Sequence, residues 1–201
     1  MYQNFRKKHF EPFLFASVKI EEVKPKVLYH ASANRNLDVL EPRAESVRDI
    51  REGPAVFATP DKAGVTKFIV PVKDSWTRMG SFGDVHFHVI SDRKRYEEAD
   101  KGGTIYHLSS DTFELNHEFG EGKDEWTSKD AVKSIEREDY ESGLQAQLDN
   151  GVQVFFVDKE TFGRIDKSDD HGNAILRTLE SENKVRNINP KEIPPLTGKH
   201  R

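Results

Sequence analysis

The chain contains no cysteine among its 201 residues. This absence excludes disulfide bonds, thiolate nucleophiles and thiolate-ligated zinc from the chemistry of the sequence. Long apolar runs are also missing. No segment approaches the roughly 20 residues that a membrane-spanning helix needs, and the stretch at residues 10–16 is too short and interrupted for the core of a signal peptide. We therefore expect a cytoplasmic protein with no membrane partner.

A strong excess of one charge is absent as well. Basic residues number 31 and acidic residues 35, so the net charge is only −4. A value this small gives no global field that would draw the protein to nucleic acid. Two local basic clusters, at residues 6–8 and 93–95, leave a nucleic-acid contact open, but clusters of this kind are more typical of a solvated surface.

Aromatic residues, in contrast, are plentiful, with 13 phenylalanines. This content indicates a folded core, because large aromatic side chains contribute little to stability unless they are buried. The length suits one domain, which we place at residues 27–186. Residues 1–26 form an N-terminal extension in this interpretation, and residues 187–201 form a loose C-terminal tail.

Short runs of strand-forming residues recur along this domain. They lie at residues 27–30, 56–58, 84–90, 104–108, 125–128, 131–135 and 152–157. Runs of this length, separated by turn residues and a few helices, predict the α+β class. We expect short, mostly antiparallel strands in split sheets, with the helices flanking them.

Two helices have recognisable signals. Thr59, Pro60 and Asp61 are typical of a helix start, with Thr59 as the N-cap, Pro60 at the first helical position and Asp61 near the positive end of the dipole. A second helix is expected over residues 138–150, where apolar residues recur at helical spacing before an Asn-Gly pair.

The clearest candidate chemistry lies at the end of the first strand. Residues 28–32 read LYHAS, an apolar run that leads into a turn of small residues. Such a strand end can hold the imidazole of His30 and the hydroxyl of Ser32 at the edge of a cleft. The small Ala31 between them leaves room for a flat ligand against the backbone.

Two later segments complete a pattern with the first. Residues 53–59 read GPAVFAT and residues 124–128 read DEWTS. In this order, the three segments resemble the core of the ADP-ribosyltransferase fold, the NAD-binding scaffold of poly- and mono-ADP-ribosyltransferases and RNA 2′-phosphotransferases. They are similar, respectively, to the family's aromatic-His-Gly-Ser/Thr motif, its Gly-x-Tyr-Phe-Ala motif, and its late strand on which a glutamate precedes an aromatic residue.

The resemblance implies a role for each matching position. His30 would bind the ribose hydroxyls of NAD, and Ser32 would bind the nicotinamide carboxamide. Phe57 or Phe68 would form an aromatic wall beside the nicotinamide, and Glu125 would be the catalytic carboxylate. The remaining implied NAD contacts come from the same two strands: Tyr29, Ala31, Val56 and Ala58.

The implied reaction transfers ADP-ribose from NAD to an unknown macromolecular or small acceptor and releases nicotinamide. Cleavage of the nicotinamide–ribose bond develops oxocarbenium character, which a carboxylate near the ribose stabilises. Glu125 suits that role and can also orient the acceptor. NAD is the only small molecule that this interpretation requires, and no metal is expected.

Other interpretations remain open. Because Val56 occupies the family's tyrosine position, the chain is alternatively a catalytically inactive module of the same fold that binds a nucleotide or a protein. RNA phosphotransfer is a third possibility. His86 and His88 lie two apart on an expected strand and face one side. With His107 they would suggest a metal site, although half-exposed strand histidines are commoner.

Overall fold

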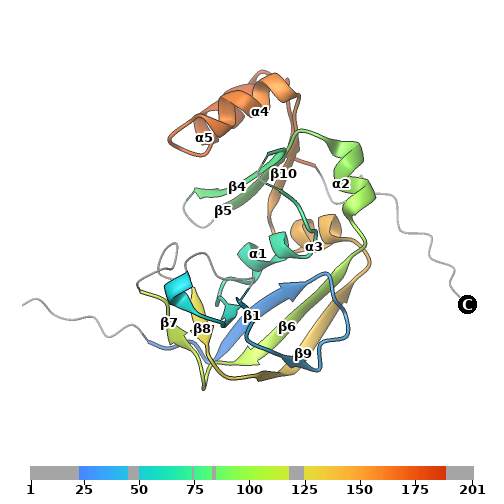
Figure 1. Cartoon of the computed structure of the whole chain (residues 1–201). Helices are drawn as coiled ribbons and strands as arrows, with labels where there is room; N and C mark the ends of the chain where they lie inside the picture. Colours follow the sequence, from blue (N-terminus) through green and yellow to red (C-terminus); the bar gives the residue numbers. More distant parts are fainter. Residues whose placement is uncertain (1–22, 45–49, 74, 83–84, 118–124, 189–201) are drawn as a thin grey trace, which may run out of the picture.

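The computed structural model describes residues 23–44, 50–73, 75–82, 85–117 and 125–188. Within these residues the strands form three sheets. The largest is antiparallel throughout, with the strand order β1-β6-β9-β2 (Figure 1). Its strands are β1 (Val27–Ser32), β6 (Gly103–Ser109), β9 (Val132–Tyr140) and β2 (Val39–Leu40).

The two smaller sheets have three strands each. One has the order β10-β5-β4, in which β5 is antiparallel to β4 and parallel to β10. The other has the order β3-β8-β7 and is antiparallel. Their strands are β10 (Gln153–Phe156), β5 (Val85–Ile90), β4 (Thr77–Phe82), β3 (Val56–Ala58), β8 (Trp126–Ser128) and β7 (Glu114–Leu115).

Helices separate and cover the sheets. The described α-helices are α1 (Lys62–Val65), α2 (Arg93–Ala99), α3 (Gly143–Asp149), α4 (Lys159–Asp166) and α5 (Asn173–Ser181), with short 3₁₀ turns η2 (Ile50–Glu52) and η3 (Thr66–Phe68). Figure 1 shows α1 and α3 between the β1-β6-β9-β2 sheet and the β10-β5-β4 sheet, whereas α4 and α5 cover the far side of the latter. The α+β class predicted from the sequence is therefore confirmed.

Three hydrophobic clusters hold these layers together. The first lies between the two larger sheets and includes Ile69, Ile105 and Leu144. The second packs β1 and β6 against β3 and β8. The third joins β5 and β10 to α4 and α5. Trp76 is buried in the first cluster and Trp126 in the second.

The expected helix start at Thr59 is wrong by two residues. Asp61 is the N-cap, and its Oδ1 accepts a hydrogen bond from the Gly64 N–H at 2.8 Å. Thr59 is still extended because its backbone forms a two-bond bridge with Tyr29, at 2.7 and 3.0 Å. That bridge makes Thr59 a continuation of β3 and ties β3 to β1.

The helix expected over residues 138–150 also begins later. β9 continues to Tyr140, which pairs with Gly103 at the end of the β6 ladder. Ser142 then caps α3 by accepting a hydrogen bond from the Gln145 N–H at 3.2 Å. The expected strand at residues 131–135 is accordingly longer, because pairing with β6 outweighs the helical spacing of the side chains.

Several elements were not expected from the sequence, namely α2, α4, α5, β2, β4 and β7. In α2 the basic residues 93–95 belong to a helix capped by Asp92, whose Oδ1 accepts from the Arg95 N–H at 3.0 Å. Charged residues on the exposed face hid its helical pattern. Within the part of the chain that the structure describes, no helix has the length and apolar character needed to cross a membrane.

The ends of the chain lie largely outside the described residues. Of the N-terminal extension, Lys24 donates a hydrogen bond to the Asp111 carbonyl at 3.2 Å. Of the C-terminal tail, Asn187 and Ile188 are tied to β10. The Asn187 Oδ1 accepts from the Val154 N–H at 2.8 Å, and the Ile188 N–H donates to the Val154 carbonyl at 3.0 Å.

Candidate functional site

His30 projects from β1 toward β3. Its Nδ1 lies 2.8 Å from the carbonyl oxygen of Phe57, so Nδ1 carries the proton and donates it. Burial lowers the pKa of His30, the hydrogen bond to Phe57 opposes this, and the positive charge of Arg43 lowers the pKa further. The ring is therefore neutral at physiological pH, and its Nε2 presents a lone pair that can accept a hydrogen bond.

Strand β3 links His30 to the region of Glu125. Ala58 of β3 pairs with Trp126 of β8, and Glu125 immediately precedes Trp126. Thr59 pairs with Tyr29, the neighbour of His30. Neighbouring strands are about 4.8 Å apart, so β1 and β8, on either side of β3, lie about 10 Å apart. Three segments far apart in the sequence thus meet at one end of β3.

His30 and Glu125 have different described neighbours. The His30 ring is near Tyr106, with ring centroids 6.5 Å apart, and Tyr106 belongs to the same hydrophobic cluster as Trp126. Side chains alternate along an extended chain, so Glu125 points away from Trp126 and that cluster. A ligand that touches both residues has to extend past the Thr59 end of β3.

Glu125 is held by Asn116, which follows β7. The Asn116 Nδ2 donates to Oε1 of Glu125 at 2.8 Å and to Oε1 of Glu52 at 2.7 Å. The Asn116 backbone N–H also donates to the Glu125 carbonyl at 2.8 Å. Glu52 and Asn116 are only 7% and 9% exposed, whereas Glu125 is half-buried. One buried amide therefore connects a buried carboxylate to a partly accessible one.

Neither Glu52 nor Asn116 was expected from the sequence. Glu52 ends a charged segment that the sequence indicates only as a connection, and Asn116 lies in no motif. The lone hint is that Glu52 directly precedes the Gly53-Pro54 pair of the second motif. Asp124, which belongs to the third motif, lies outside the described residues.

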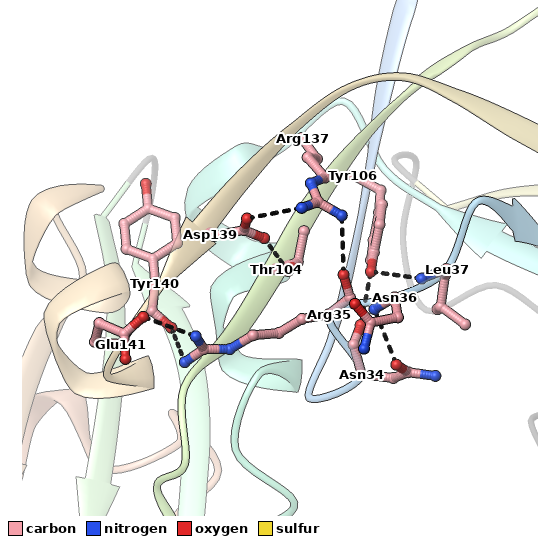
Figure 2. Close-up of polar contacts among 10 residues, drawn as sticks. All are labelled: Asn34, Arg35, Asn36, Leu37, Thr104, Tyr106, Arg137, Asp139, Tyr140 and Glu141. Atoms are coloured by element: carbon pink, nitrogen blue, oxygen red, sulfur yellow. Dashed lines mark hydrogen bonds and ion pairs between the residues drawn. The ribbon is translucent and has the colours of Figure 1, made fainter. Parts of the chain in front are cut away.

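The loop after β1 is fixed in place by Tyr106. The Tyr106 hydroxyl donates to the Asn34 carbonyl at 2.7 Å and accepts from the Leu37 N–H at 3.2 Å (Figure 2). Ser32 contributes to the same turn, since its Oγ accepts a hydrogen bond from the Asn34 N–H at 3.1 Å. The Ser32 hydroxyl keeps its proton for donation to another group.

Arg35 ties the same loop to the start of α3. Its guanidinium bonds to the Glu141 carboxylate at 2.7 Å and to the Tyr140 carbonyl at 2.9 Å (Figure 2). It also donates to the Lys101 carbonyl at 3.1 Å. Gly102 permits this approach, because its φ is +68° and a Cβ there would collide with the Arg35 guanidinium and the Tyr140 carbonyl. The loop that follows the expected NAD-binding strand is thus already ordered.

The other expected NAD contacts have unequal access. Ala31, Val56 and Ala58 are buried in hydrophobic clusters, so their side chains are not available to a ligand. Phe57 is half-buried. Phe68, in η3, is 58% exposed, and the Lys67 ammonium lies 5.0 Å from its ring centroid. Of the two expected aromatic walls, Phe68 has the more accessible ring.

A second polar cluster lies beside Tyr29, whose ring meets the His107 ring edge-on at 5.0 Å. Glu138 of β9 accepts from Lys62 at 2.6 Å, from His107 Nε2 at 2.6 Å and from the Tyr140 hydroxyl at 3.0 Å. Burial raises the pKa of Glu138, but these three hydrogen bonds outweigh burial and the pKa is lowered. The cluster fastens α1 to the sheet.

The three strand histidines have separate partners. The His86 Nε2 is 2.6 Å from Asp61, and His107 bonds to Glu138. His88, buried at 1% exposure, donates from Nδ1 to Gln147 at 2.9 Å. Burial lowers the pKa of His88 to about 4, against the opposing effect of this hydrogen bond. Among the described residues, no group of three or more potential ligands is placed to hold a metal ion.

A hollow of about 1080 Å³ lies elsewhere, between α2, the start of α3 and the segment after α5. Tyr96, Phe156 and Lys184 are among its lining residues, and none of the expected site residues lines it.

No family model, curated protein or solved structure matches the chain.

Proposed function

We propose that this chain has the ADP-ribosyltransferase fold, binds NAD at the Thr59 end of β3, and transfers ADP-ribose to an acceptor. The observation that carries the proposal is the state of His30. Its Nδ1 is bonded to the Phe57 carbonyl and its ring is neutral, so Nε2 is oriented to accept a hydrogen bond from a ribose hydroxyl. Ser32, two residues later, retains a hydroxyl proton for the nicotinamide carboxamide.

In this reaction the bond from ribose C1′ to the nicotinamide nitrogen breaks, and its electron pair leaves with nicotinamide. An oxygen or nitrogen of the acceptor forms the new bond to C1′, and the proton it loses passes to the Glu125 carboxylate. Before that, the same carboxylate stabilises the positive charge that develops on the ribose. The half-buried position of Glu125 gives it access to a ligand and partial shielding from water.

The aromatic wall beside the nicotinamide is assigned to Phe68. Its ring is exposed. In chain order, Thr59 is followed by α1 and then by η3, which carries Phe68. Ring stacking on nicotinamide would cover apolar surface that is now in water. Phe57 contributes its backbone carbonyl, which orients His30.

The test is nicotinamide release from NAD by the purified chain, with Glu125→Gln and His30→Ala as variants. Matched controls are Glu97→Gln, on exposed α2, and His171→Ala, in the exposed turn before α5. Loss of turnover in the first pair alone, with unchanged circular dichroism, supports the enzyme. Failure of the unmodified chain both to bind and to cleave NAD would remove the proposal.

One observation favours the alternative of a catalytically inactive module. Val56 occupies the position of the family tyrosine, and its side chain is 3% exposed in the hydrophobic core. No aromatic side chain therefore reaches the ligand from that position. NAD binding by isothermal titration calorimetry, without release of nicotinamide, would select this alternative.

A further inference from the structure

We infer that Asn116, anchored by the buried Glu52, is a positioning residue that fixes the Glu125 carboxylate for the transfer reaction. This inference rests on the proposed function, because it assigns a task to the same site. It concerns two residues that carry no sequence motif.

The geometry makes the Asn116 amide a link with a single orientation. An amide nitrogen has two hydrogens that point in different directions, and here each is directed at a different carboxylate, at 2.7 Å for Glu52 and 2.8 Å for Glu125. Turning the amide over would direct its carbonyl oxygen at both carboxylates, which is strongly repulsive. The Nδ2 atom is therefore the one that faces Glu52 and Glu125.

Glu125 is held at two points by the same residue. Besides the side-chain bond, the Asn116 N–H donates to the Glu125 carbonyl at 2.8 Å. A glutamate side chain has three rotatable bonds and loses considerable freedom when its end is fixed. The link thus orders the carboxylate before a ligand arrives, so that this ordering does not add to the reaction barrier.

Glu52 supplies the fixed end of the link. It is 7% exposed, and the Lys129 ammonium donates to its backbone carbonyl. Hydrogen bonds to a carboxylate that is shielded from water are stronger than neutral ones. Asn116 is 9% exposed, so water competes weakly for its amide. The buried Glu52 therefore fixes the Asn116 amide, and that amide in turn restricts the position of the partly accessible Glu125 carboxylate.

The first experiment compares Asn116→Leu with the unmodified full chain. Leucine has a similar volume but no donor. We expect kcat for nicotinamide release to fall about ten- to a hundredfold, because the side-chain hydrogen bond from Asn116 that orients the carboxylate is lost. The Kd for NAD should change less than about twofold, because ground-state binding does not use the link. Unchanged kcat, or a Kd that rises in proportion to the loss of kcat/KM, overturns the inference.

Asn150→Leu is the matched control. Its amide also donates two hydrogen bonds, to the Tyr140 hydroxyl at 3.3 Å and to the Ala146 carbonyl at 2.8 Å, but at the end of α3. We expect no change in kcat for the folded fraction. An equal loss of kcat in the control would overturn the inference, because it would assign the effect to general loosening.

Asn116→Asp adds a signature that a purely structural role would not give. The introduced carboxylate repels Glu52 and Glu125, whereas its protonated form has the shape of asparagine and can donate one hydrogen bond. We expect its kcat, relative to that of the unmodified chain, to recover as the pH falls from about 8 to about 5. A ratio that stays constant over this range, with fluorescence showing folded protein, contradicts the inference.

A readout without NAD separates this inference from the proposed function. The side-chain amide of Asn116 should give two protected ¹H–¹⁵N resonances, one of which shifts on Glu125→Gln and the other on Glu52→Gln. If the two resonances exchange freely with solvent and do not shift in either variant, Asn116 does not hold the two carboxylates and the inference is overturned. If the chain leaves NAD intact but these resonances behave as expected, the proposed transfer function is wrong, whereas the hydrogen bonds that hold Glu125 are confirmed.

Discussion

Glu138 and Glu125 are both half-buried glutamates near β1, but their surroundings differ in kind. Glu138 accepts from an ammonium, an imidazole and a phenol, at 2.6, 2.6 and 3.0 Å. Glu125 accepts a hydrogen bond from the Asn116 amide, which also donates to Glu52. The first arrangement stabilises the charge where it is. The second joins Glu125 to the buried Glu52 through one amide nitrogen, which restricts the freedom of the Glu125 side chain.

The largest expected effect separates the two glutamates by activity. Glu125→Gln should reduce kcat for nicotinamide release by about 10²–10³-fold, because an amide cannot stabilise the developing positive charge. Its melting temperature should stay close to that of the unmodified chain. Measurement is by chromatography of released nicotinamide. Equal loss of turnover in Glu138→Gln would break the distinction.

The next effect is on stability and is set by pH. His88 is neutral in the folded chain because burial lowers its pKa to about 4, whereas the unfolded chain takes up a proton near pH 6.5. Stability is therefore full above pH 6.5 and declines toward pH 4, by about 3 kcal/mol in all. Urea unfolding at a series of pH values measures this decline, which His88→Gln should largely remove.

The carboxylate of Glu138 acts in a lower pH range. Because its pKa is lowered in the folded chain, its contribution is present above the unfolded value near 4.5 and is lost as the pH falls through the folded value. At neutral pH, Glu138→Gln should reduce the free energy of unfolding by about 1–2 kcal/mol, a modest figure since the cluster is partly solvated. A larger loss of stability in Glu125→Gln would reverse the comparison.

The smallest effect is expected from removing one of the three hydrogen-bond donors to Glu138. Lys62→Met should lower the free energy of unfolding by about 0.5–1 kcal/mol, because the Lys62 side chain is 31% exposed and two other donors remain on Glu138. Equilibrium urea unfolding is the measurement. A change in the Kd for NAD would place Lys62 at the ligand instead.

Local patterns predicted the parts of this fold that depend on neighbouring residues. Apolar runs located β1, β3 and β10, and the α+β class followed from their lengths. The helix cap moved from Thr59 to Asp61 because Thr59 forms a bridge with Tyr29, 30 positions earlier in the chain. Such long-range pairing leaves no trace in the local spacing of side chains.

The candidate site divides in the same way. His30 and Glu125 were expected because each lies in a motif beside a strand. Asn116 was missed because its two partners are 64 and 9 positions away, and no periodicity connects them. Glu52 was missed because a charged connection ordinarily faces water, whereas here it is buried and accepts a hydrogen bond from Asn116.

The hydrogen bond between His30 and the Phe57 carbonyl connects two sheets. Besides hydrophobic packing, the β3-β8-β7 sheet joins β1 through the bridge between Thr59 and Tyr29 and through the imidazole of His30. His30 therefore connects the two sheets, in addition to being a proposed ribose contact. His30→Ala removes both the hydrogen bond to Phe57 and the proposed ribose contact. Asparagine, which can keep a donor toward the Phe57 carbonyl, would leave the sheets joined while deleting the ring nitrogen proposed to contact the ribose.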